Sequence, residues 1–157
     1  HEFDFLYVPF QDGQYVLHSY SLNIPCIGIS SLEVLAYNVS TDGLICSTID
    51  CKNDNCYFAL YELKNGNYKV LEHPTSESIS NVLDLLNTKY ENTNITFVGD
   101  GIKENSISNY LDSFNLGIAG FNKFISNNRN GEEILPMYLK KPQAERQLEE
   151  KLKKLGE

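Results

Sequence analysis

Two short segments of this chain carry residue types that could perform chemistry. Asp50, Cys51 and Lys52 are consecutive and follow an apolar run, so they are predicted to lie where a strand ends. A lysine beside a cysteine favours the thiolate, which is the nucleophilic form of that side chain. The sequence offers no histidine with Asn or Asp in an arrangement that would complete a nucleophile. A structural role for Cys51 is therefore the favoured interpretation.

The second segment is Gly99-Asp100-Gly101, which follows the apolar run Ile95–Val98 and precedes a helical pattern. Ligands collect at such strand ends in α/β folds, and glycine N–H groups beside a helix can bind phosphate. The segment matches neither G-x-G-x-x-G nor a P-loop, and the carboxylate of Asp100 would repel phosphate. A tight turn is therefore favoured over a phosphate site.

The histidines and cysteines form no recognisable metal site. The histidines are scattered at positions 1, 18 and 73, and the cysteines at 26, 46, 51 and 56 have the spacing of neither a zinc knuckle nor a redox C-x-x-C pair. Cys26 and Cys46 lie within apolar runs and are predicted to be small core residues. Cysteines of this kind indicate a reducing compartment, hence the cytoplasm.

Composition sets the outer bounds. The 157 residues, 41% of them hydrophobic, are enough for one domain or two small ones. A net charge of −8 argues against a surface that grips nucleic acid by itself, and no apolar run is long enough to span a membrane. The C-terminal tail, residues 140–157, is the exception, with six Lys or Arg against four Asp or Glu. Its candidate contact residues for an anionic partner are Lys140, Lys141, Arg146, Lys151 and Lys154. A solvated helix face is the alternative.

Strand and helix patterns alternate along the chain, which predicts an α/β fold with a mixed sheet. The predicted strands are 3–8, 24–29, 44–49, 56–63, 68–71 and 95–98. The predicted helices are one that begins at Ser30 or Ser31 with a capping box to Glu33, and others at 79–86, 107–111, 116–125 and 143–155. Asn65-Gly66 between two strand patterns predicts a hairpin. In the last helix Leu148, Leu152 and Leu155 form one stripe, which is expected to pack on the body of the protein.

Four segments, in the right order, resemble the TsaB (YeaZ) family of bacterial tRNA threonylcarbamoyladenosine synthesis. Residues 23–36 (N-I-P-C-I-G-I-S-S-L-E-V-L-A) look like the family's N-I-P-L-V-G-V-S-S-L-E-A-L-A. Residues 49–52 with 56–61 are similar to its I-D-A-R … V-Y-x-A-L-Y, residues 97–101 to its x-x-G-D-G, and residues 136–145 to its closing P-x-Y-L-R-K-x-Q-A-E. The resemblance implies an actin/Hsp70-like (ribonuclease H-like) ATPase fold with two lobes.

The chain also departs from the family pattern. The family's opening strand with a D-T-S-T-type phosphate turn is absent, and residues 8–15 stand where the family has G-P-G-S-F-T-G-L-R. The first lobe is therefore expected to be largely missing, with residues 1–38 as its remnant and residues 39–157 as the second lobe with the C-terminal helix. Nucleotide binding by this chain is not expected.

The resemblance implies a non-catalytic scaffold that pairs with the catalytic paralogue TsaD. With the ATPase TsaE, this pair would support threonylcarbamoyl transfer to the adenosine beside the tRNA anticodon. ATP and Mg²⁺ would be bound by the partner subunits, and tRNA would be met only through the complex. Pairing in the family uses first-lobe helices, so Tyr15, His18 and Leu22 are the candidate interface residues here.

Three alternatives stay open. One is a small phosphotransferase or kinase-like enzyme of the same ASKHA superfamily, which would need a glycine-rich phosphate loop and an Asp base that the sequence does not display. Another is a glycoprotease, as the M22 glycoprotease-like name of the family suggests, although the metal-binding histidine pair of the catalytic paralogue is missing. The third is a self-associating module, such as a homodimer, outside tRNA modification.

Overall fold

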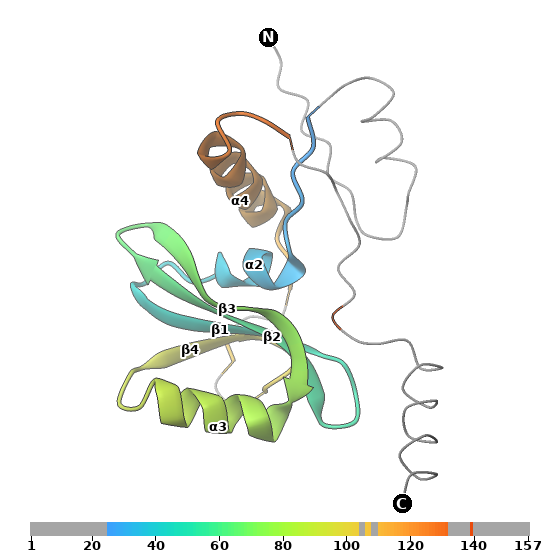
Figure 1. Cartoon of the computed structure of the whole chain (residues 1–157), viewed down its shortest axis with the longest axis vertical. Helices are drawn as coiled ribbons and strands as arrows, with labels where there is room; N and C mark the ends of the chain where they lie inside the picture. Colours follow the sequence, from blue (N-terminus) through green and yellow to red (C-terminus); the bar gives the residue numbers. More distant parts are fainter. Residues whose placement is uncertain (1–24, 104–105, 108–109, 132–138, 140–157) are drawn as a thin grey trace, which may run out of the picture.

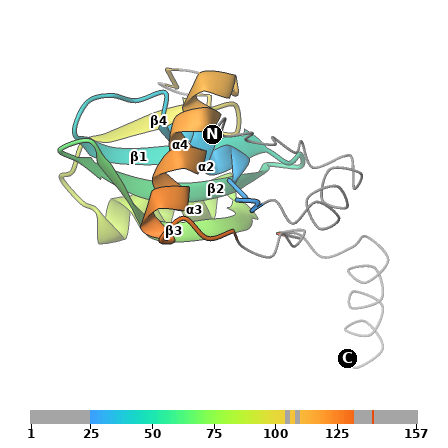
Figure 2. The ribbon, with the colours of Figure 1, turned by 90° about the horizontal axis from the view of Figure 1, so that it is seen from above.

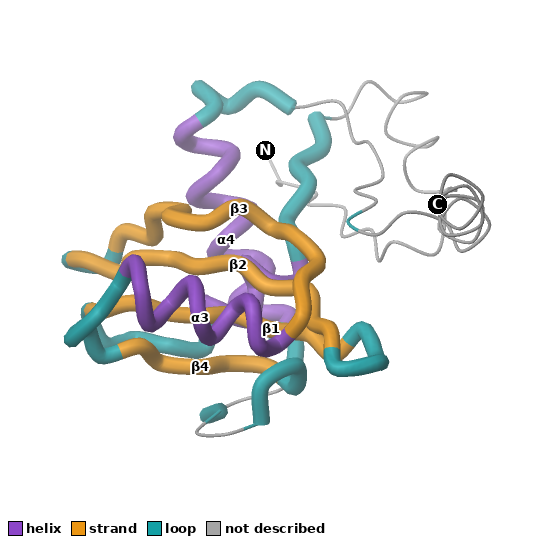
Figure 3. The backbone as a smooth tube through the Cα atoms, turned by 60° about the horizontal axis from the view of Figure 1, so that its bottom comes forward, coloured by secondary structure: helices purple, strands orange, loops and turns teal. Residues whose placement is uncertain are grey.

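The computed structural model describes residues 25–103, 106–107, 110–131 and 139. They form a four-stranded mixed sheet with helices on both faces (Figure 1). The strands are β1 (Gly43–Asp50), β2 (Asn55–Lys64), β3 (Asn67–Ser78) and β4 (Ile95–Gly99). Their order is β3-β2-β1-β4, with β2 antiparallel to both β1 and β3, and β4 parallel to β1 (Figure 3). The mixed sheet predicted from the sequence is confirmed.

Three helices surround this sheet. They are α2 (Ser31–Ala36), α3 (Ile79–Lys89) and α4 (Ser113–Ser126). Helices α2 and α3 lie on opposite faces of the sheet, and α4 lies on the α2 side, against α2 (Figure 1). Seen from above, α4 crosses over the strands (Figure 2). The division of the chain into a first-lobe remnant over residues 1–38 and a second lobe over residues 39–157 stays a prediction.

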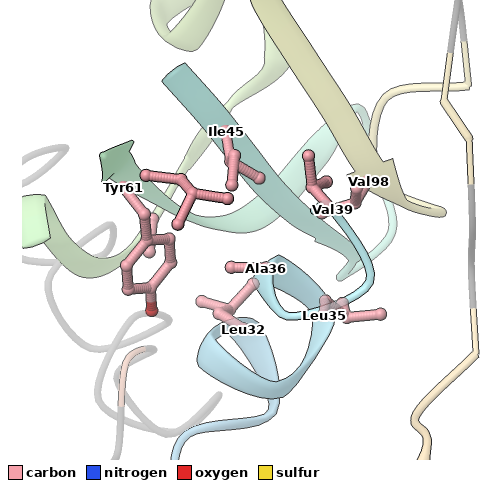
Figure 4. Close-up of a cluster of buried hydrophobic side chains, with 9 residues drawn as sticks. Leu32, Leu35, Ala36, Val39, Ile45, Tyr61 and Val98 are labelled. Carbon is pink, nitrogen blue, oxygen red and sulfur yellow. The ribbon is translucent and has the colours of Figure 1, made fainter. Parts of the chain in front are cut away.

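Side chains on alternate strand positions point to opposite faces of the sheet, which creates two apolar clusters. On the α2 face Leu32, Leu35 and Ala36 pack against Ile45 and Tyr61, all 2% exposed or less (Figure 4). On the α3 face Val82 and Leu86 meet the strand residues Leu44, Cys46, Cys56, Phe58 and Leu60. The predicted core face of residues 32–36 is confirmed. Tyr57 and Tyr61 also share one face while Phe58 takes the other, as predicted.

Each of the three helices begins with a side chain that accepts a hydrogen bond from a backbone N–H of the first turn. The Ser30 hydroxyl accepts a hydrogen bond from the N–H of Leu32 at 3.2 Å, so Ser30 is the N-cap of α2. Ser78 caps α3 through the N–H of Asn81 at 3.2 Å, and Asp112 caps α4 at its own first turn. The predicted cap at Ser30 is therefore confirmed.

The β2–β3 hairpin has the predicted turn. Asn65 and Gly66 have φ of 52° and 75°, the left-handed pair that closes a tight hairpin between antiparallel strands. The N–H of Asn65 donates to both carboxylate oxygens of Asp42 at 3.1 Å, which ties the turn to the segment before β1. Strand β3 continues to Ser78, beyond its predicted end at residue 71, because β2 offers it paired positions as far as Asn55.

Two predicted elements are wrong. Residues 25–29 form no strand, because they run along α4 and not along another strand: the ammonium of Lys123 donates to the carbonyl of Gly28 at 2.7 Å. The described part of 107–111 is not helical, because the N–H of Ile107 donates to the carbonyl of Phe97 at 3.1 Å and so follows the edge of β4. The predicted strand 3–8 and helix 143–155 lie outside the described residues.

Candidate functional site

The turn after β4 is held by one buried threonine. The carbonyl of Thr48 accepts from the N–H groups of Asp100 at 3.1 Å and Gly101 at 3.4 Å. Its hydroxyl accepts from the N–H of Ile102 at 3.1 Å and donates to the carbonyl of Val98 at 3.3 Å. Three successive N–H groups, the kind of donors that would cradle a phosphate, are thus already bonded within the protein. This geometry supports the tight turn over the phosphate site.

The glycines of this turn are needed for close packing. Gly99 has φ of 95°, and a Cβ there would lie 1.9 Å from the Thr48 carbonyl oxygen. A Cβ on Gly101 would lie 2.8 Å from the Cβ of Cys56. Both distances are shorter than real side chains allow, so each glycine lets two backbone segments meet. The Gly-Asp-Gly sequence therefore has a structural explanation.

At the end of β1, carboxylates also accept hydrogen bonds from backbone N–H groups. The Asp100 carboxylate accepts from the N–H of Asp50 at 2.9 Å, and the Asp50 carboxylate accepts from the N–H of Lys52 at 2.8 Å. Lys52, Asn53 and Asp54 all have positive φ, between 55° and 66°, in the turn that follows. The Cys51 sulfur lies 3.7 Å from the hydroxyl of Ser76. The two acidic residues therefore stabilise backbone turns.

No group of three or more His, Cys, Asp or Glu side chains that could hold a metal ion exists among the described residues. Cys46 and Cys56 are fully buried, whereas Cys26 and Cys51 are half-buried. The prediction of a core position is thus confirmed for Cys46, while Cys26 is only partly enclosed. Burial raises the pKa of the Cys46 thiol to about 12 and that of Cys56 to about 11, which keeps both protonated at neutral pH.

A groove of about 1170 Å³ lies on the α2 side of the sheet. We call it the α4 groove. Its walls come from the start of α2, from the β2–β3 end of the sheet and from one face of α4, and include Tyr37, Tyr57, Tyr68, Val70, Phe121 and Ile125. Leu139 also lines it. Its lining is mainly aliphatic and aromatic, which suits an apolar binding partner.

Hydrogen bonds hold the aromatic side of the groove in place. The rings of Tyr37 and Tyr68 stack at 4.0 Å with 17° between their planes. The Tyr68 hydroxyl donates to the carbonyl of Val39 at 2.6 Å, and the amide of Asn122 on α4 donates to the Tyr37 hydroxyl at 3.4 Å. Burial raises the pKa of Tyr37 and of Tyr61, so both hydroxyls stay neutral. These contacts hold the aromatic side of the groove in one arrangement.

Helix α4 exposes much apolar surface at and beside this groove. Phe121 is 51% exposed and Ile125 43% exposed, although both line the groove. Phe114, on the first turn of α4, is 73% exposed. Exposed apolar residues that gather around a concave surface mark a binding site more often than scattered ones do.

None of the partner-contact residues predicted from the sequence lies in the described part of the chain. The candidate interface residues Tyr15, His18 and Leu22 precede it. The candidate tail residues Lys140, Lys141, Arg146, Lys151 and Lys154 follow it. They stay predictions. The α4 groove was not foreseen, although one signal was present: residues 114–125 are apolar around most of the helix, more than one buried face needs.

No helix in the described residues has the length and apolar character that crossing a membrane requires.

Two solved structures from Pseudomonas aeruginosa are similar to this fold. One is described as an uncharacterized protein with similarity to peptidase YEAZ, with a TM-score of 0.55 and 16% identity over 84% of this chain and 69% of that chain. The other is YeaZ, with a TM-score of 0.52 and 16% identity over 83% of this chain and 70% of that one. At this identity the likeness establishes the fold.

Sequence comparison identifies the family. The chain is 31% identical over 104 residues to the Bacillus subtilis tRNA threonylcarbamoyladenosine biosynthesis protein TsaB. The match covers 66% of this chain and 43% of that protein, so the chain spans less than half the length of this relative. A family model described as "TsaD: tRNA N6-adenosine threonylcarbamoyltransferase" matches residues 18–146, which is most of the chain. The chain therefore belongs to the family that this model describes, and within it is a TsaB (YeaZ)-like protein.

Proposed function

We propose that this chain is a non-catalytic scaffold subunit in the addition of a threonylcarbamoyl group to the adenosine beside the tRNA anticodon, and that it pairs with a TsaD-like catalytic paralogue. The observation that carries the proposal is the family match over residues 18–146, together with the TsaB relative. A TsaE-like ATPase would complete the assembly, and tRNA would be met through the complex.

The arrangement of polar groups favours a scaffold over a transferase. The N–H groups of Asp100, Gly101 and Ile102 all donate to Thr48, so they are not available as donors to a nucleotide phosphate. Asp50 and Asp100 accept backbone N–H groups at the same end of the sheet. These contacts support the proposal that ATP and Mg²⁺ are held by the partner subunits.

The charge of the chain also favours a scaffold over a subunit that binds tRNA by itself. A net charge of −8 repels the phosphate backbone of tRNA, so affinity for tRNA would have to come from other subunits. An acidic subunit is suited to pairing with a basic protein, because complementary charge speeds association. Residues 140–157, which carry a small positive excess, are the exception and could face an acidic partner or the tRNA.

Co-purification with the TsaD-like protein of the same organism tests the pairing, both with and without ATP and Mg²⁺. We expect a complex in at least one of these conditions. Leu22→Asp, at the candidate interface, should abolish it. Leu83→Asp, the same change on the 37%-exposed position of α3, should leave it intact. If no complex forms in either nucleotide condition, the scaffold function is wrong.

Titration calorimetry with ATP and Mg²⁺ separates the scaffold from the phosphotransferase alternative. A scaffold of this kind should release no binding heat and hydrolyse no ATP when alone. Tight binding with turnover by the isolated chain would replace the scaffold with a kinase-like enzyme. Mass spectrometry of tRNA from a strain lacking its own TsaB would then show whether the chain restores threonylcarbamoyladenosine.

A further inference from the structure

The dipeptide Asn-Gly occurs twice in the described part of the chain, as Asn65-Gly66 in the β2–β3 turn and as Asn130-Gly131 after α4. The backbone nitrogen of the residue after an asparagine can attack the asparagine side chain. Glycine allows this attack most readily, because it has no Cβ and the least restricted backbone. The asparagines of both pairs are exposed to solvent. The two pairs differ in what lies around the glycine.

Gly66 has room to move. A Cβ at this position would meet no atom within 4 Å, and its N–H donates no hydrogen bond within the described residues. The N–H of Asn65 donates to Asp42 at 3.1 Å, but rotation about the Cα–C bond of Asn65 leaves that hydrogen bond in place. The tip of a hairpin also opens at a lower free energy than the sheet behind it. The nitrogen of Gly66 can therefore turn toward the side-chain amide of Asn65.

Gly131 lies against the backbone of the segment that precedes α2. A Cβ on this glycine would lie 2.9 Å from the nitrogen of Cys26 and 2.9 Å from the Cα of Pro25. The N–H of Asn130 donates to the carbonyl of Asn127 at 3.1 Å, which ties this residue to the end of α4. Backbone segments that meet this closely restrict each other's rotation. Attack on Asn130 therefore requires the two segments to separate first.

We propose that Asn65 is a site of spontaneous deamidation in the folded protein, and that the packing of Gly131 protects Asn130. The backbone nitrogen of Gly66 bonds to the side-chain Cγ of Asn65 and closes a succinimide ring. The bond from Cγ to the side-chain nitrogen breaks, and ammonia leaves with the proton of the Gly66 N–H. One water molecule then opens the ring at either carbonyl, which gives aspartate or isoaspartate at position 65. This inference does not depend on the tRNA-related function proposed above.

Both products alter the hairpin. Each places a carboxylate at residue 65, whose N–H already bonds the carboxylate of Asp42, so two like charges meet at the turn. Isoaspartate also adds one methylene to the main chain of a two-residue turn. The register that pairs Lys64 with Asn67 depends on the length of this turn. Gly66 and Asn67 line the α4 groove, so the change also reaches one rim of the groove.

Peptide mapping with tandem mass spectrometry tests the proposal on the full chain, incubated at mildly alkaline pH, which favours loss of the amide proton. In the folded protein, deamidation at Asn65 should be faster than at Asn130 by about fivefold or more. In guanidinium chloride, which removes the packing, the two rates should agree within about twofold. The matched control is Asn65→Gly, which removes the side-chain amide but accepts the positive φ of the turn. It should leave the slow reaction at Asn130 unchanged.

Deamidation of Asn130 as fast as that of Asn65 in the folded protein would overturn the proposal, and so would a folded protein that does not react at Asn65. A ratio of the two rates that guanidinium chloride leaves unchanged would overturn the protective role of the packing around Gly131. The isoaspartate form, separated by chromatography, should melt at a lower temperature than the Asn65→Asp variant, because it alone carries the extra methylene. Equal melting temperatures would overturn the proposed effect on the hairpin.

Discussion

Replacing Thr48 by valine should destabilise the protein more than any other loss of a single hydroxyl in the described core. The change conserves shape, yet it leaves the N–H of Ile102 without its acceptor and removes a donor from the carbonyl of Val98. Thr48 is fully buried, so water cannot replace these bonds. A stranded buried N–H costs about 1–3 kcal/mol, and the second bond adds about 1 kcal/mol. We expect a loss of about 2–4 kcal/mol in the free energy of unfolding.

Urea unfolding followed by circular dichroism measures this loss, and the melting temperature should fall by about 4–16 °C for a chain of this length. Thr48→Ser is the first control: it keeps the hydroxyl, loses one methyl group and should cost only about 1 kcal/mol. Ser47→Ala is the second. The neighbouring Ser47 hydroxyl is equally buried but has no hydrogen-bond partner in the described structure, so its removal should be neutral or stabilising. If Thr48→Val is as stable as Thr48→Ser, the threonine does not hold the turn.

The remaining predictions concern separate parts of the fold. Gly66→Val should cost about 1 kcal/mol or more in unfolding free energy, because Gly66 has φ of 75° and a Cβ there meets no atom within 4 Å, which leaves backbone strain as the cost. Gly117→Ala, in open space on α4, should instead stabilise by about 0.5–1 kcal/mol, and both are read from thermal melts. A thiol reagent should label the two half-buried cysteines of the native protein and leave Cys46 and Cys56 unlabelled until denaturant is added, because both are fully buried with raised pKa. A hydrogen bond from the last-turn lysine of α3 lowers the pKa of Glu72, so its contribution to stability is present at neutral pH and is lost as the pH falls below 4.5 and through the folded pKa. Glu72→Gln should therefore lose less stability than the wild type between pH 7 and pH 3 in urea unfolding.

Local signals in the sequence predicted most of the described elements. The hairpin could be placed because Asn65 and Gly66 tolerate the left-handed backbone that the turn needs. The start of α2 could be placed because Ser30 supplies an acceptor for an N–H at the helix start. Strands β1 and β2 could be placed because their apolar side chains point alternately into the clusters on the two faces of the sheet. Each of these signals acts within a few residues along the chain.

The two wrong predictions arise from contacts between residues that are far apart in the sequence. The apolar run at residues 25–29 has the composition of a buried strand, but its neighbour in space is α4, about ninety residues later in the sequence. Ile107 belongs to a helical pattern, but its N–H is taken by Phe97 at the edge of the sheet. Whether the N–H groups after Gly99 are available to a phosphate likewise depends on Thr48, about fifty residues earlier, and the sequence alone could favour the tight turn but not show this contact. A linear pattern could not reveal these partners, because they meet only in the folded chain.

The polar groups that could bind a ligand and the exposed apolar surface lie in different parts of this fold. At the ends of β1 and β4, the carboxylates and N–H groups that could have acted on a ligand bond one another across two turns. At the α4 groove, apolar side chains from a helix and a strand stay exposed in the described structure. A change at Thr48 should therefore lower stability without a specific effect on binding, whereas a change at Phe121 or Val70 should alter what the groove holds at little cost to the sheet. The scaffold function proposed above would use that separation, because a surface can then change to fit a partner while the core stays the same.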